Sequence, residues 1–348
     1  MNYKKRLTIP LKNGQADKFQ GLSRAVFMKQ LVIVLLFLGV VSHHGLATEP
    51  SPQDLARQLI TAFNAGQKNQ FTPAALATNE LILQKAEKDY PDDPSIHSAL
   101  GACYMAQENM PACVGSMEKA YVTSKHDPRT GMMYALALKM NKELSKAYSV
   151  DKEMVAEHPD IPQLQFSLAT LEMTIQKYDE AVAILEPLWA KAPANLPEKD
   201  KGTINFMLGL CYLYNGQHAK AISSLENANS HFPNAGMIYN VLGEAYLKGG
   251  EPDKAKDFLE KALAINPKLP SALYYRGICL ERSGDSEHAN KCFQECYRFG
   301  KDWLRDNGED YYLMAQVCSK ISKQEEADDY RKQASQLLYT YQAPWKKN

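Results

Sequence analysis

The sequence repeats itself at a spacing of 34 residues. Residues 208–234 read LGLCYLYNGQHAKAISSLENANSHFPN, and residues 242–268 read LGEAYLKGGEPDKAKDFLEKALAINPK. Identical residues recur in one register at Leu208/Leu242, Gly209/Gly243, Tyr212/Tyr246, Ala221/Ala255, Leu225/Leu259, Ala228/Ala262 and Pro233/Pro267. Self-similarity of this kind indicates one structural unit that is duplicated along the chain.

The spacing inside the unit predicts two helices joined by a tight turn. The shared Leu, Gly and Tyr of the first half fall on one helical face, and the shared Ala, Leu and Ala of the second half form an apolar stripe. Asn215-Gly216 and Gly249-Gly250 are expected to supply the positive φ of the turn. Gly243 is expected to let its helix approach the second helix at Ala255, and Pro267 to end the unit.

The repeat resembles the tetratricopeptide repeat, a family of helical hairpins with the same period. The resemblance implies an all-α fold, a right-handed superhelical solenoid of about eight helical hairpins in which each hairpin covers the apolar surface of its neighbours. No stretch of the chain shows the alternating pattern of a half-buried strand. A single solenoid is therefore expected in place of the roughly two domains that the length alone favours.

The period places the remaining units. Repeats are predicted at 94–127, 128–161, 162–195, 202–235, 236–269, 270–303 and 308–341. Residues 48–93 are expected to form a degenerate N-terminal hairpin or cap, with helices over 52–65 and 73–90. Residues 342–348 are left as a tail.

Residues 1–47 have the features of a secretory signal peptide. They carry seven basic residues and one acidic residue, and residues 31–41 form an apolar run. That run is too short for a bilayer, which needs about 20 apolar residues. Gly45 and Ala47 predict cleavage before Thr48, and Met28 is a candidate start. We expect an exported protein, periplasmic or secreted; the alternative is a membrane anchor made by an uncleaved signal.

Charge and motif content argue against nucleic-acid binding and catalysis. Basic and acidic residues are equal at 40 each, so removal of residues 1–47 leaves an acidic excess that repels phosphate backbones. The common nucleotide-binding, metalloprotease and nucleophile-elbow motifs do not occur, and the histidines show no metal-ligand spacing. We therefore expect no enzyme activity, no cofactor and no metal site.

Seven cysteines follow the predicted cleavage point, an odd number that is not arranged as a disulfide scaffold. Cys113 and Cys296 stand where the repeat has Ala, which fits a small apolar residue. Whether any disulfide forms is left open. Cys292, Cys296 and Cys318 fall on consecutive predicted helices and are the favoured set for one.

The resemblance also implies where a partner binds, because solenoids of this family bind along a concave groove lined by the first helix of each repeat. The positions concerned hold mainly apolar and aromatic residues. The candidate groove residues are Met132, Leu136, Phe166, Met173, Phe206, Leu210, Leu213, Tyr214, Tyr274 and Tyr312. The alternative for each of them is packing against the next repeat.

These features together predict a noncatalytic scaffold protein of a bacterial cell envelope, which holds an extended segment of a partner protein in its concave groove. One alternative is a structural or assembly subunit of an envelope secretion or pilus-type complex, in which self-association is expected. A minor alternative is an accessory subunit of an enzyme. The expected partner is another protein or peptide and not nucleic acid, and contact with a membrane is expected only through an uncleaved signal.

Overall fold

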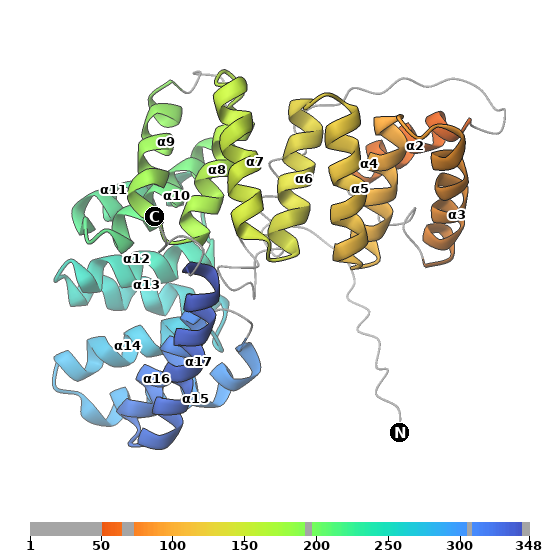
Figure 1. Ribbon diagram of the computed structural model, residues 1–348. Coiled ribbons are helices and arrows are strands. Elements are labelled where there is room, and N and C mark those ends of the chain that lie inside the picture. Colours follow the sequence, from red (N-terminus) through yellow and green to blue (C-terminus); the bar gives the residue numbers. More distant parts are fainter. Residues whose placement is uncertain (1–50, 65–72, 192–196, 305–307, 343–348) are drawn as a thin grey trace, which may run out of the picture. The chain divides into compact units, whose positions relative to one another are not determined.

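The computed structural model describes residues 51–64, 73–191, 197–304 and 308–342. The secondary structure of these residues is α-helical throughout, with sixteen helices and no strand among them (Figure 1). The prediction of an all-α fold is confirmed. The predicted signal peptide, residues 1–47, and most of the tail, residues 342–348, lie outside the described residues.

The helices follow one another in pairs, and short turns join the two helices of each pair from α4/α5 onward. Their bounds are α2 (Pro52–Asn64), α3 (Pro73–Asp89), α4 (Pro94–Ala106), α5 (Met110–Thr123), α6 (Pro128–Met140), α7 (Leu144–Glu157), α8 (Pro162–Thr174), α9 (Tyr178–Ala190), α10 (Glu198–Tyr214), α11 (His218–His231), α12 (Gly236–Lys248), α13 (Pro252–Ile265), α14 (Pro270–Arg282), α15 (Ser286–Trp303), α16 (Gly308–Lys320) and α17 (Gln324–Gln342). Five of the first helices begin with Pro, whose fixed φ suits the first turn of a helix and whose missing N–H is not needed there. The limits of the repeats themselves stay a prediction.

The chain divides into two compact units, which are described separately. The N-terminal unit holds α2 to α9, and the C-terminal unit holds α10 to α17 as far as Ala334. Inside each unit the two helices of a pair pack together, and the second helix packs on the first helix of the next pair. First helices also touch one another, α6 with α8 in one unit and α12 with both α10 and α14 in the other. We call each such row of first helices a first-helix layer.

Glycine at one register position allows the helices of a pair to approach closely. A Cβ added at Gly209 would lie 2.6 Å from Cγ of Leu225, and one at Gly243 would lie 2.5 Å from Cγ of Leu259. Real Cβ atoms do not come so near, so only Gly fits without a shift of the Leu side chain or of its helix. The sequence predicted the approach but assigned it to Ala255; the nearest atoms belong to Leu259, and the Ala255 carbonyl oxygen is 3.2 Å away.

From the α4/α5 pair onward, the turn inside each pair has one residue in the left-handed region. Gly216 and Gly250 have φ of 73° and 88°, whereas Asn215 and Gly249 have φ of −80° and −74°. Only the second residue of each predicted dipeptide therefore takes the positive φ. The same place in earlier pairs is held by residues other than glycine, namely Glu108, Lys142 and Gln176.

All seven cysteines are buried and free. The disulfide that was left open is therefore not formed, and this includes the set Cys292, Cys296 and Cys318. Burial raises the pKa of the Cys113 thiol to about 12, so it remains protonated at neutral pH. The Cys296 thiol donates a hydrogen bond to the Pro270 carbonyl oxygen at 3.0 Å. These side chains fill the core as small apolar residues.

Candidate binding surface

The ten candidate groove residues all lie on first helices of pairs. Four belong to the N-terminal unit and six to the C-terminal unit. Their places are Met132 and Leu136 on α6, Phe166 and Met173 on α8, Phe206, Leu210, Leu213 and Tyr214 on α10, Tyr274 on α14 and Tyr312 on α16.

Most of these side chains are covered. Leu136, Phe166, Met173, Phe206, Leu210, Leu213 and Tyr274 each keep between 1% and 8% of their area exposed. Leu136 and Tyr274 belong to hydrophobic core clusters, and the Tyr274 ring centre lies 5.9 Å from that of Phe293 on α15. The surroundings of these two residues fit the alternative to the groove role, which is packing inside the protein.

The residues that keep exposed area are Met132, Tyr214 and Tyr312. Tyr312 is 53% exposed, and the other two are half-buried. Only these three of the ten candidates therefore offer side-chain surface to the solvent beyond 8% of their area. The groove role of all ten residues stays a prediction.

Polar side chains interrupt the apolar register on α12. Asn240 stands at the register position of Phe206 and Tyr274, and Glu244 stands at that of Leu210. Asn240 is 6% exposed and Glu244 is 2% exposed. Because they are four residues apart, both side chains lie on one face of the helix.

These groups form a small connected patch. Lys248 Nζ donates to Glu244 Oε1 at 2.9 Å, and the same Nζ lies 5.6 Å from the centre of the Tyr214 ring on α10. The carboxamide oxygen Oδ1 of Asn240 is buried and has no hydrogen-bond partner among the described residues. We call Tyr214, Asn240, Glu244 and Lys248 the α12 patch. Of these four residues only Tyr214 was named as a candidate from the sequence, and the burial of Asn240 and Glu244, which depends on neighbouring helices, was not anticipated.

The N-terminal unit contains a buried ion pair that joins three helices. Lys139 Nζ on α6 lies 3.1 Å from Asp151 Oδ2 on α7 and 2.8 Å from Ser167 Oγ on α8. Ser167 Oγ donates to the other oxygen of Asp151 at 2.9 Å. Asp151 is 1% exposed. The three polar groups satisfy one another, which is the arrangement in which a buried charge stabilises a packed core.

Glu172 is a second buried acid on this layer. It lies near the end of α8 and is 4% exposed, and its Oε2 has no hydrogen-bond partner among the described residues. Burial and, next, the negative charge of Glu180 raise the pKa of this carboxyl to about 7. Glu172 therefore changes charge near neutral pH, which no pattern in the sequence indicated.

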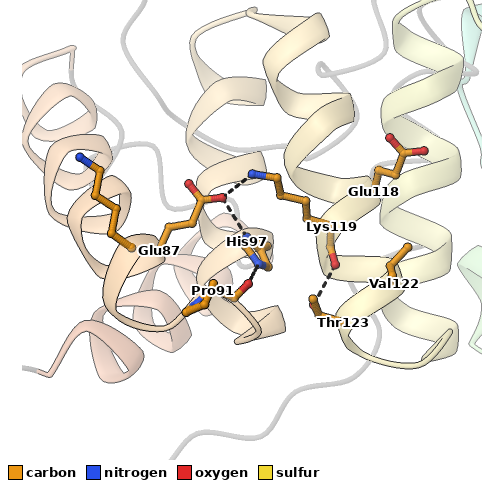
Figure 2. A pocket seen from close by; sticks show the side chains of 8 residues that line it. Glu87, Pro91, His97, Glu118, Lys119, Val122 and Thr123 are labelled. Atoms are coloured by element: carbon orange, nitrogen blue, oxygen red, sulfur yellow. Dashed lines mark hydrogen bonds and ion pairs between the residues drawn. The ribbon is translucent and has the colours of Figure 1, made fainter.

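A pocket of about 500 Å³ lies among α3, α4 and α5 (Figure 2). Its buried side chain is His97, which donates from Nε2 to the Pro91 carbonyl oxygen at 2.7 Å and has Nδ1 3.3 Å from Glu87 Oε1. Lys119 Nζ lies 2.8 Å from the same Glu87 oxygen. His97, Glu87 and Lys119 are thus engaged with one another and with backbone. The pocket lies where α3 meets the next pair, α4 and α5.

None of the helices within the described residues is long and apolar enough to cross a membrane.

Comparisons with known proteins agree with the repeat architecture. The family model described as tetratricopeptide repeat matches residues 212–277. No curated protein matches the chain. A solved tetratricopeptide repeat protein from Parabacteroides merdae is 14% identical with a TM-score of 0.53, and the match covers 81% of this chain and 99% of that one.

Two further solved structures have lower TM-scores. A human IFIT1 dimer with PPP-AAAA is 15% identical, with 82% of this chain and 73% of that chain covered and a TM-score of 0.48. YrrB, described as a TPR protein with an unusual peptide-binding site, is 17% identical, with 55% and 95% covered and a TM-score of 0.46. Only the Parabacteroides merdae structure has a TM-score above 0.5, and at 14% identity it is informative about the fold alone.

Proposed function

Since the chain carries tetratricopeptide repeats, we propose that it is a noncatalytic interaction protein that holds an extended segment of a partner protein along its first-helix layer. Repeat solenoids of stacked helices present extended surfaces of this kind. The apolar register on α10 and α14 supplies packing, and the α12 patch supplies polar contact.

The single observation that carries the proposal is the α12 patch. Asn240 and Glu244 are buried where the neighbouring repeats have Phe, Tyr and Leu, although an apolar residue there would serve the fold better. Leaving a buried polar group unpartnered costs about 1–3 kcal/mol. An extended polypeptide carries a donor and an acceptor on nearly every residue, so it can provide the missing partner after a small movement of the Asn240 side chain.

Removal of the Asn240 carboxamide tests the proposal. The partner is first isolated by crosslinking in native envelope extract, and its affinity is then measured by calorimetry for the wild type and for Asn240→Ala. We expect binding to weaken at least about tenfold, which corresponds to 1.4 kcal/mol. Unfolding should change little, because Ala removes an unsatisfied polar group.

A matched control is Leu81→Ala. Leu81 is 70% exposed on α3, outside the first-helix layers, and its truncation should leave the affinity unchanged. Equal affinities of wild type and Asn240→Ala would rule out the α12 patch as the recognition surface.

We also propose that the protein acts in the cell envelope after export. The support is the apolar run at 31–41 followed by Gly45 and Ala47. N-terminal sequencing of the exported protein should show Thr48 as the first residue. A membrane-bound product that still contains residues 31–41 would instead establish a membrane anchor. A defined homo-oligomer without a bound partner would favour the alternative of an assembly subunit.

A further inference from the structure

Three potential metal ligands meet at the end of α7. His126 lies in the turn that follows α5, and Glu153 and Glu157 lie four residues apart on α7. One ligand atom of each, an imidazole nitrogen or a carboxylate oxygen, lies within 4.8 Å of both others. All three side chains are exposed, so an ion from solution can reach them.

The distance between His126 and Glu153 suits two ligands of one metal ion. Nδ1 of His126 is 3.4 Å from Oε1 of Glu153. That is longer than the 2.7–3.2 Å that is usual for an N–H···O hydrogen bond. Two ligands bound to Zn²⁺ at about 2.0–2.1 Å in tetrahedral geometry are separated by roughly 3.4 Å.

Negative charge is concentrated at this end of α7. Glu153 and Glu157 have the i,i+4 spacing at which like charges repel. Both stand near the C-terminal end of the helix, where the macrodipole is negative, and the last turn contains no basic residue. A bound cation would relieve these repulsions together.

A buried hydroxyl beside the acidic pair is the independent observation. Tyr121 is 5% exposed, and its hydroxyl has no hydrogen-bond partner among the described residues. The hydroxyl lies close enough to Glu153 and Glu157 to interact with the charges of both carboxylates. The Tyr121 ring stacks on the His126 imidazole with centres 4.4 Å apart, which fixes the plane of the imidazole.

We propose that His126, Glu153 and Glu157 bind a divalent transition-metal ion of the Zn²⁺ class, which ties the turn between two repeats to the second helix of the following repeat. One imidazole nitrogen and two carboxylate oxygens are ligands that Zn²⁺ accepts, whereas Ca²⁺ and Mg²⁺ prefer oxygen ligands alone. Water fills the remaining coordination position. The Tyr121 hydroxyl is placed to donate a hydrogen bond to a bound carboxylate.

Calorimetric titration of the full chain with ZnCl₂ tests the site. The protein carries no affinity tag and is kept under a phosphine reductant that holds its cysteines as thiols. We expect one Zn²⁺ per chain and a rise in the thermal midpoint on binding. His126→Ala and Glu157→Gln should each weaken this binding at least about tenfold, the scale seen when metal-site residues are lost.

The matched control is His288→Ala. His288 Nδ1 lies 2.9 Å from Asp285 Oδ1 on an exposed surface, and within the described part of the chain no third ligand accompanies that pair. Zn²⁺ binding should be unchanged in this variant, and Ca²⁺ and Mg²⁺ should produce no comparable heat. Absence of a stoichiometric Zn²⁺ site would overturn the proposal. So would unchanged Zn²⁺ binding in both His126→Ala and Glu157→Gln, when circular dichroism shows that these variants are folded.

Discussion

Glu172 makes the stability of the N-terminal unit depend on pH. Its pKa is about 7 in the folded chain, against an ordinary value of 4.5. Between these values the folded state keeps a proton that the unfolded state has released, so the free energy of unfolding falls as pH rises through this window. The loss is complete above pH 7 and amounts to about 3 kcal/mol at most, since one pKa unit is about 1.4 kcal/mol.

Glu172→Gln should remove this dependence. The variant has no carboxyl to ionise, so it should be more stable than the wild type at pH 8 and of similar stability at pH 5. Urea unfolding of both proteins at pH 5, 6, 7 and 8 measures the difference. The control is Glu260→Gln, since Glu260 is exposed on α13. If the free energy of unfolding depends on pH equally in wild type and Glu172→Gln, Glu172 is not the group responsible.

The exposure of single side chains was poorly predicted from the sequence, because side chains from other helices decide which residues are buried. Phe166 and Phe206 were expected to offer aromatic surface to a partner, yet they are 8% and 1% exposed. Truncation of a buried Phe costs about 3–5 kcal/mol, so replacing Phe206 by Ala would report on folding before it reports on binding. Tyr214 and Asn240 are therefore better probes of the surface.

Helix pairing depends on the glycine at the close approach. Gly243→Ala introduces a Cβ 2.5 Å from Leu259 Cγ and 3.2 Å from the Ala255 carbonyl oxygen, so the Leu259 side chain must move or α12 and α13 must separate. We expect a loss of about 1–3 kcal/mol in the free energy of unfolding, the usual cost of overpacking. Thermal or urea unfolding monitored by circular dichroism measures it.

Gly115 on α5 is the matched control. A Cβ added there would have nothing within 4 Å, so Gly115→Ala should be neutral or stabilise by up to about 1 kcal/mol through helix propensity. If the two variants have the same free energy of unfolding, the glycine at position 243 is not needed for the close approach of the helices.

Elements were the most predictable part of the molecule. The helices expected over 52–65 and 73–90 are found at Pro52–Asn64 and Pro73–Asp89, since Pro and apolar spacing mark helix limits locally. The turns were harder. Glu108, Lys142 and Gln176 adopt positive φ without being glycine, because the packing of the two helices imposes the turn whatever residue occupies it.

For the whole molecule, the period of 34 residues predicted the fold class because a repeated hairpin must stack on its neighbours. The period shows which residues are equivalent from one repeat to the next. It does not show which side chains of different helices touch one another. His126 is 27 residues before Glu153 in the sequence, and it meets Glu153 and Glu157 only because the turn after α5 lies beside α7. The same holds for Lys139, which reaches Asp151 on the next helix.

Photo-crosslinking tests the central claim, that a partner lies along the first helices. In the protein in its native extract, the photo-crosslinker benzoylphenylalanine replaces Tyr214 or Tyr312, which lie on first helices. As controls it replaces Leu81 or Val122, which are exposed residues on second helices. If a partner lies along the first helices, residues 214 and 312 crosslink to one segment of it and residues 81 and 122 do not. Crosslinks that form from residues 81 and 122 but not from 214 and 312 would contradict it.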